Sequence, residues 1–324
     1  MLVFLKNWAL PVAMLTGVIG YFILSGVSFL EPVKPAVNWL IAVLTPSLIF
    51  LQLLLTFCKV EPKELMPKTW HIWLLLIQAL SSGVIALLLL YYPMNADYKV
   101  IFEGAMVCLI CPTATAAAVI TGKLGGSPST LTTYTLLCNI LAAVAVPLVF
   151  PLVEPHSDVT FVIAFLKILS KVFPLLLFPF FLAMILRYFI PTVHKFLLKY
   201  HGMAFYLWAV ALTIVTGQTV RSLANSSAPV SIEMNLAYAG LFTCAIQFLL
   251  GKIIGGHYND RISGGQALGQ KNTVLAIWMA CTYLNPLSSV APGSYVVWQN
   301  VINSYQLWKK RKKENTESVN VESL

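Results

Sequence analysis

A short polar stretch near the end of the chain carries the residues whose chemistry most needs an explanation. Gly264 to Trp278 (GGQALGQKNTVLAIW) includes Gln266, Gln270, Lys271 and Asn272, and it lies where the hydropathy pattern predicts a membrane helix. A lysine near the bilayer centre costs roughly 2.5 to 3.5 kcal/mol on insertion scales, so a compensating partner is expected. Polar, glycine-rich backbone at this depth is tolerated only where it faces protein or water. The stretch is therefore predicted to form part of a binding site.

A second apolar segment is interrupted in the same way by CPTATA (Cys111 to Ala116). Each interruption begins a half-helix near the membrane midplane, whose free N–H groups and dipole favour an anion by up to about 1 kcal/mol. With the charge of Lys271 added, an organic anion is the expected ligand. The predicted substrate-binding residues are Thr113, Thr115, Gln270, Lys271, Asn272, Thr273, Asn139 and Gln78.

Three of these residues have structural alternatives. Gln78 and Asn139 lie on the neighbouring third and fifth segments, where hydrogen bonding between helices alone explains them equally well. Lys271 has the alternative of a structural ion pair, or a cap on backbone carbonyls, without any contact to substrate.

Glu103 is the other charged residue within an apolar segment, about two helical turns before Cys111. If it paired with Lys271 and titrated, transport would be coupled to protons. The alternative is that Glu103 lies near the lipid headgroups with Lys99, four residues before it.

The composition is that of an integral membrane protein. The chain has 324 residues, of which 58% are hydrophobic and only 10% charged, with a mean hydropathy of +0.80; soluble domains have about 25% charged residues. Ten spans of about 20 residues fit and leave no room for a soluble domain. The six cysteines lie in or beside apolar segments without paired spacing, which indicates free packing thiols. The partners expected are a bilayer and a small molecule, and not nucleic acid, despite the net charge of +9.

Ten apolar segments are predicted to cross the membrane. In the sixth, the part that carries Lys167 and Lys171 is predicted to form an interfacial helix that leads into the span near Val172. The segments run over residues 8–28, 36–58, 70–92, 100–123, 128–153, 159–189, 203–222, 234–254, 263–284 and 289–308.

Assigning the segment ends alternately to two sides separates the basic residues. One side receives Lys6, Lys59, Lys63, Lys68, Lys123, Arg187, Lys195, Lys199, Lys252, Arg261 and the run Lys309 to Lys313, and the other receives Lys34, Lys99 and Arg221. By the positive-inside rule the first side, with both termini, is cytoplasmic, in a multi-pass protein of the plasma (inner) membrane. The residues after the basic run are predicted to be a disordered tail.

The two halves are predicted to be inverted repeats. Residues 1–155 would hold five spans with a broken helix at 111–116, residues 156–308 five more with a broken helix at 266–272, and residues 309–324 a basic cytoplasmic tail. Five is an odd number, so the second unit is inserted upside down relative to the first. Paired interruptions at corresponding positions indicate the binding site of a transporter.

The two interrupted segments resemble those of the bile acid:sodium symporter (BASS) family. They are CPTATAAAVITGKLGG (Cys111 to Gly126) and GQKNTVLAIWMACTYLNPLSSVAPGSYVVWQN (Gly269 to Asn300). The residues that carry the resemblance are Cys111, Pro112, Thr115, Ala116, Gly269, Asn272, Pro292, Gly293, Trp298 and Asn300. The resemblance implies an all-α polytopic membrane fold of ten helices in two inverted five-helix repeats. Two broken helices would cross in a core domain beside a panel domain, and the substrate would be an organic anion.

The chain departs from the family pattern at the ion sites. Ala117 and Ala118 stand where the family has Ser-Asn, Ala267 stands where it has Glu, and Lys271 stands where it has Gln. Methyl groups supply no ligands for sodium, and an ammonium repels a second cation by roughly 4 kcal/mol at 4 Å with an effective dielectric near 20. The hypothesis is that Lys271 replaces the coupling cation. No metal site or cofactor is predicted, and proton coupling stays open.

The function predicted is secondary transport of an organic anion, a small carboxylate or a bile-acid-like molecule, by alternating access. The alternatives are a proton-coupled or facilitative exporter of the arsenite or auxin type and a transport-inactive membrane sensor on the same fold. An intramembrane enzyme is not expected, because the chain has no HExxH, GxSxG or paired-aspartate motif.

Overall fold

The computed structural model describes residues 2–155, 159–200 and 202–322, and this part of the chain is helical with no β-strand beyond one isolated bridge. The α-helices are α1 (Leu2–Gly26), α2 (Lys34–Phe57), α3 (Thr69–Tyr91), α4 (Ala96–Ile110), α5 (Ala117–Leu124), α6 (Pro128–Val153), α7 (Phe161–Phe189), α8 (Pro191–Lys199), α9 (Met203–Ala224), α10 (Val230–His257), α11 (Arg261–Gly269), α12 (Thr273–Tyr283) and α13 (Val290–Glu322). Three short 3-10 helices are η1 (Ser28–Val33), η2 (Pro62–Glu64) and η3 (Pro286–Ser289).

Seven stretches of the described chain are long and apolar enough to cross a membrane. They are Ala9–Gly26, Ser28–Phe57, Thr69–Tyr91, Pro128–Val153, Phe161–Phe189, Met203–Ala224 and Val230–His257. Each agrees with one predicted span, and together they give a multi-pass membrane protein. The three other predicted spans fall on the pair α4 and α5, on the pair α11 and α12, and on the first part of α13.

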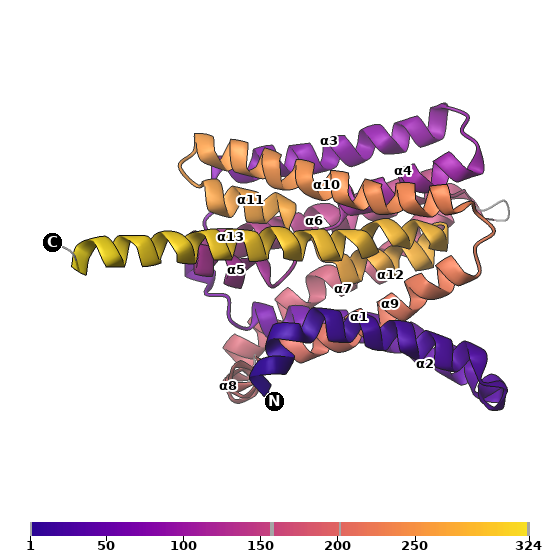
Figure 1. The fold of residues 1–324 in the computed structure, drawn as a ribbon, viewed down its shortest axis with the longest axis horizontal. Coiled ribbons are helices and arrows are strands. Elements are labelled where there is room, and N and C mark those ends of the chain that lie inside the picture. Colours follow the sequence, from indigo (N-terminus) through magenta and orange to yellow (C-terminus); the bar gives the residue numbers. More distant parts are fainter. Residues whose placement is uncertain (1, 156–158, 201, 323–324) are drawn as a thin grey trace.

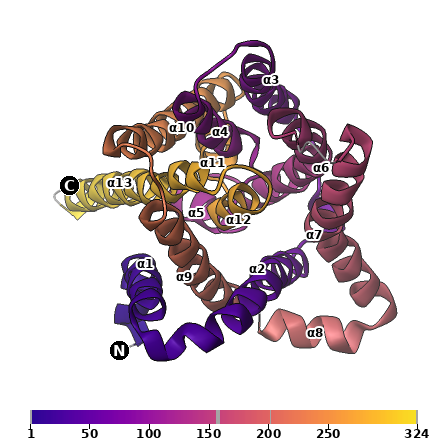
Figure 2. The same cartoon turned by 90° about the vertical axis from the view of Figure 1, so that its right-hand side faces the viewer.

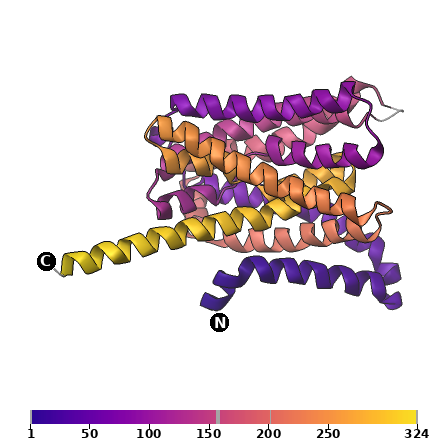
Figure 3. The ribbon, with the colours of Figure 1, turned by 45° about the horizontal axis from the view of Figure 1, so that its top comes forward.

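The long helices run side by side along the longest axis of the molecule (Figure 1). Seen end-on, α1, α9, α2 and α7 follow one another along one side, and α3 to α6 pack with α10 to α13 on the other (Figure 2). The start of α1 and the end of α13 point toward the same end of the bundle (Figure 3). The broken helices lie within the second group.

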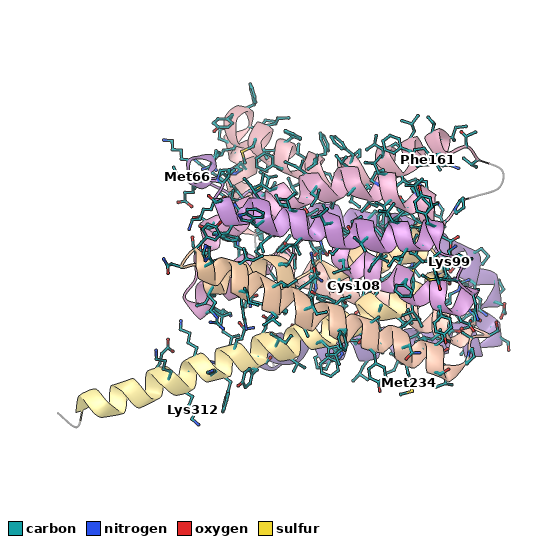
Figure 4. The ribbon with its side chains drawn as sticks, turned by 90° about the horizontal axis from the view of Figure 1, so that it is seen from above. Met66, Lys99, Cys108, Phe161, Met234 and Lys312 are labelled. Carbon is teal, nitrogen blue, oxygen red and sulfur yellow. The ribbon has the colours of Figure 1, made fainter. Side chains whose placement is uncertain are left out.

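Side-chain contacts at the two ends of the bundle agree with the predicted alternation. Met66 and Lys312 lie at one end, and Lys99, Phe161 and Met234 lie at the other (Figure 4). At the first end, the Lys68 ammonium is 2.9 Å from the Asp260 carboxylate, and Lys310 Nζ donates to the Lys123 carbonyl at 2.9 Å.

Helices α10 and α11 approach closely because glycines face each other. A Cβ added to Gly251 would lie 2.3 Å from the Gly264 carbonyl oxygen, and one added to Gly264 would lie 2.5 Å from the Gly251 oxygen. No side chain fits between the two backbones at this point. The paired glycines at the start of the polar stretch therefore serve helix packing.

The predicted interfacial helix before Val172 is not formed, because α7 is continuous from Phe161 to Phe189. Lys167 and Lys171 are exposed on its outer surface. The aliphatic part of a lysine side chain can lie along the apolar helix surface while its ammonium reaches water. A continuous membrane helix can therefore contain both lysines.

A short amphipathic helix after α7, missed in the sequence, has the character of an interfacial helix. In α8, His194 is buried with Nε2 at 3.0 Å from the Cys58 carbonyl oxygen, whereas Lys195 and Lys199 are exposed. Phe196, also exposed, is an apolar side chain on the outer surface of the same helix.

The prediction of a disordered tail is wrong up to Glu322, because α13 continues as a helix through the basic run. Lys, Arg and Glu are good helix formers. Lys310 Nζ also lies 3.4 Å from the Glu314 carboxylate, one turn later.

Candidate functional site

The two interruptions meet as extended segments. Cys111 follows α4 and Gln270 follows α11, and both have extended backbone conformations. The backbone N–H and carbonyl groups that come after them therefore have no partners within a helix. Thr113 and Lys271 lie opposite each other in an antiparallel bridge. The two bonds run from the Ala114 N–H to the Gln270 carbonyl and from the Asn272 N–H to the Pro112 carbonyl, both at 2.9 Å. Each break therefore satisfies the backbone of the other, as membrane depth requires.

The second break is shorter than predicted. It spans residues 270–272, because α11 continues to Gly269 and includes Gln266. The Gln266 side chain donates from Nε2 to Asn303 Oδ1 on α13 at 2.9 Å. Because its side-chain amide has this partner, Gln266 can lie inside a buried helix. The polarity of Gln266 therefore does not indicate a helix break.

The Lys271 ammonium is buried, at 1% exposure, in a site of oxygen atoms. Its Nζ donates to Gln78 Oε1 at 3.0 Å and to the Leu109 carbonyl at 3.3 Å. Leu109 belongs to the last turn of α4, where unpaired carbonyls carry partial negative charge. The compensation expected for a buried lysine is therefore supplied by oxygen dipoles.

Gln78 holds both α4 and the ammonium. Its Nε2 donates to the Ile110 carbonyl at 2.9 Å, while its Oε1 accepts from Lys271 and from Cys138 Sγ, the latter at 3.1 Å. Asn139 is buried too, and its Nδ2 has no hydrogen-bond partner among the described residues. These contacts match the interhelical alternative for Gln78.

The end of α11 is closed by hydroxyl groups. Thr113 Oγ1 donates to the Ala267 carbonyl at 2.6 Å, and the Tyr295 hydroxyl donates to the Gly269 carbonyl at 2.7 Å. The Lys271 N–H donates to Gln299 Oε1 at 3.0 Å. Tyr295 and Gln299 were missed in the sequence, although they are four residues apart on α13 within GSYVVWQN, which places them on one helix face.

Few of the predicted ligands have open surface. Thr113, Gln270, Lys271 and Thr273 are buried, whereas Thr115 and Asn272 are half-buried and Ala116 is exposed. Asn272 Oδ1 accepts from the Leu275 N–H at 3.3 Å and so caps α12. The accessible part of the crossing is thus formed by Thr115, Ala116 and Asn272, beside the starts of α5 and α12.

Glu103 does not pair with Lys271, which was one of the two alternatives for it. Glu103 is fully buried, with Oε1 at 3.7 Å from Lys99 Nζ and with Oε2 accepting from the Asn285 N–H at 3.3 Å. Eight residues of helix, about 12 Å, separate it from Cys111. Glu103 therefore belongs to a cluster of its own with Lys99, as in the alternative, but it is buried there.

The positions at which the family pattern has sodium ligands are packed with apolar side chains. Ala117 and Ala267 are fully buried in one cluster with Trp70, Leu131 and Tyr134. Ala118 packs against the same cluster. These residues do not fit a sodium ion.

The comparisons with known proteins bear on the family. No curated protein matches this chain. A sequence model of the Sodium Bile acid symporter family matches residues 45–226, from within α2 to just beyond α9, which is more than half of the chain and includes the first break. This is a family of membrane transporters of small molecules. The chain belongs to the Sodium Bile acid symporter family.

Proposed function

We propose that the protein is a secondary active transporter of an organic anion, in which the Lys271 ammonium takes the place of a coupling sodium ion. The observation that carries this proposal is the position of Lys271 Nζ between Gln78 Oε1 and the Leu109 carbonyl. Carbonyl and amide oxygens of this kind can replace the hydration shell of a monovalent cation. The charge of the Lys271 ammonium would supply the field that a bound ion would otherwise bring.

The anion would bind on the accessible side of the crossing. Thr115 and Asn272 offer hydrogen-bonding groups there, next to the N-terminal ends of α5 and α12. Lys271 is buried behind them, so it would act through its charge rather than by direct contact. The ligand class is a small carboxylate or a bile-acid-like anion.

Alternating access would follow from a ten-span, inverted-repeat architecture. The repeats would be residues 1–155 and 156–308, followed by the tail 309–324. The helices α1, α2, α7 and α9 would form the panel, and α3 to α6 with α10 to α13 would form the core. The antiparallel pairing of the two breaks supports this proposal. The end that carries Met66 and Lys312 would be cytoplasmic, in the plasma (inner) membrane.

The test is thermal stabilisation of the purified protein by pyruvate, benzoate and taurocholate, each in sodium and in potassium salt. Stabilisation that is equal in both salts and is lost in Lys271→Gln would support the proposal. Lys68→Gln, an exposed lysine at one end of the bundle, is the control that should keep it. Stabilisation of the parent by sodium alone would overturn the role given to Lys271.

Uptake of the same anions into proteoliposomes separates a transporter from a sensor. Binding with saturable flux supports transport. Binding without flux would favour the transport-inactive alternative.

A further inference from the structure

A group of three charged residues, of which Glu103 is fully buried, lies away from the crossing. Lys99 Nζ is 3.7 Å from Glu103 Oε1 on α4 and 2.8 Å from Glu154 Oε1 at the end of α6. Glu103 is fully buried, and its Oε1 accepts no hydrogen bond from the described residues. Lys99 and Glu154 are each about 30% exposed at their side chains, so the group reaches water at the end marked by Lys99 in Figure 4.

The charge of this group is unbalanced. One ammonium faces two carboxyl groups, and its closer contact is with Glu154. Two like charges 4 Å apart repel by about 4 kcal/mol at an effective dielectric of 20, and a buried carboxylate without a full set of donors is costly. One added proton neutralises the group.

In the part of the chain that the structure describes, no charged group other than Lys99 and Glu154 acts on Glu103. The charged groups that act on its carboxyl are Lys99 on its own helix and Glu154 from α6. The neighbours of α4 at the adjacent Gly104 are Leu236 of α10, Ala291 of α13 and the Ser288 carbonyl of η3. In the described part of the chain, α3, α10 and α13 therefore contribute no charge to it.

Glu103 also joins the two broken helices. Its Oε2 accepts the Asn285 N–H at 3.3 Å, and Asn285 lies between α12 and η3. A hydrogen bond to an ionised carboxylate is about twice as strong as one to a neutral group. Protonation of Glu103 would weaken the hold of α4 on the end of α12.

We propose that Glu103, Glu154 and Lys99 form a binding site for one proton, which makes the proton the coupling ion of the transport proposed above. The proton arrives from water by way of Glu154 and adds to Glu103 Oε1. After the change of access it leaves Glu103 for water on the opposite side of the membrane, so one proton crosses in each cycle. The proposal rests on the proposed function for its coupling step, but not for the existence of the proton site.

The site is tested without any substrate by infrared difference spectra of the purified parent between about pH 5 and about pH 9. The expected result is a carbonyl-stretch band of a protonated, buried carboxylic acid that titrates in this range. Glu103→Gln should lose the band. Glu233→Gln is the control that should keep it, since Glu233 lies beside Met234 at the same end of the molecule and outside the group.

A second variant keeps the test decisive if Glu103→Gln fails to fold. Glu154→Gln removes the neighbouring like charge, so the midpoint pH at which the band titrates should fall by at least about one pH unit. A parent without the band, a band that survives in Glu103→Gln, or a band that Glu154→Gln leaves unmoved would overturn the proton site.

Coupling is tested by uptake of pyruvate, benzoate and taurocholate into proteoliposomes under an imposed pH gradient. The parent and Glu233→Gln should show uptake that the gradient changes severalfold, and Glu103→Gln should show uptake that it leaves unchanged. Equal dependence on the gradient in all three would overturn the coupling. An intact infrared band with no uptake by the parent would instead contradict the proposed function.

Discussion

The side chains of Thr113 and Lys271 make equivalent hydrogen bonds where the broken helices meet, each to a carbonyl of the helix that precedes the other residue. Thr113 Oγ1 donates to the Ala267 carbonyl at 2.6 Å, and Lys271 Nζ donates to the Leu109 carbonyl at 3.3 Å. Each side chain thus reaches the carbonyl four residues before its bridge partner. The antiparallel bridge thus has an approximate local two-fold axis between the two residues. The two hydrogen bonds are equivalent in position, but only the Lys271 side chain carries a charge.

Thr113→Val should destabilise the protein by about 1 to 3 kcal/mol, because it leaves the buried Ala267 carbonyl without its side-chain donor. Valine keeps the shape of the side chain, so packing changes little. The measurement is the free energy of unfolding by denaturant in mixed micelles. Thr115→Val, at a half-buried position of the same break, should stay within about 0.5 kcal/mol of the parent. Equal losses in both variants would show that the hydrogen bond contributes nothing specific.

The sequence predicted the position of the first break and placed Lys271 in the second, because polar residues inside apolar segments are conspicuous at membrane depth. It could not predict the partner of Lys271, since the Leu109 carbonyl is a backbone atom that no side-chain pattern reveals. The sequence also left open whether Glu103 pairs with Lys271 or lies with Lys99. Because Glu103 lies eight residues before the break, α4 places it near Lys99 and Asn285 instead.

Other differences have the same origin in tertiary contacts. Gln266 was predicted to lie within a break, but its amide is satisfied by Asn303, more than thirty residues later in the chain. Lys167 and Lys171 suggested an interfacial helix, yet both are exposed on a helix that continues past them. Polarity alone does not distinguish a break from a polar contact between helices.

Gly264→Ala should be strongly destabilising, because its Cβ would lie 2.5 Å from the Gly251 carbonyl oxygen and 2.7 Å from Gly255 Cα. These are backbone atoms of α10, so α10 and α11 would have to separate. Gly83→Ala on α3 is the matched control, since its Cβ meets nothing within 4 Å and alanine favours a helix. Thermal unfolding in detergent should show a clear fall for the first and no loss for the second. Similar melting temperatures would mean that the helices are not in backbone contact.

Glu61, in the loop between α2 and α3, should make the stability of the protein sensitive to acid. The hydrogen bond from Arg187 to Glu61, at 2.5 Å, holds the pKa of the Glu61 carboxyl below its ordinary value of 4.5. Because the pKa is lower in the folded state, the contribution to stability is complete above about pH 4.5 and is lost as the pH falls through the folded pKa. Glu61→Gln should flatten the acid side of a plot of melting temperature against pH. Glu64→Gln in the same loop should leave it unchanged, and a flattening there too would point to a general charge effect.

The two ends of the bundle should react with reagents from opposite sides of the membrane. Lys63 and Asn225 are exposed and follow α2 and α9, respectively. In a Cys281→Ser background, which removes the one cysteine that is not fully buried, a membrane-impermeant maleimide should label Asn225→Cys in intact cells. Lys63→Cys should react only after the cells are opened. Labelling of both in intact cells would contradict the alternation of ends and the cytoplasmic orientation.

Ala267→Glu tests whether the positions of the family's sodium ligands are closed. The glutamate would return the residue type of the family pattern to a fully buried position beside Trp70 and Tyr134. The cluster, which also contains Ala117, holds no basic side chain to pair with the new carboxylate, and a buried charge without a counter-charge costs about 3 to 5 kcal/mol. The loss of unfolding free energy should be the same in sodium and in potassium. Ala116→Glu, at the exposed alanine of the first break, should be tolerated. Selective rescue of Ala267→Glu by sodium would mean that a cation can enter despite Lys271, and that the charge of Lys271 does not replace an ion.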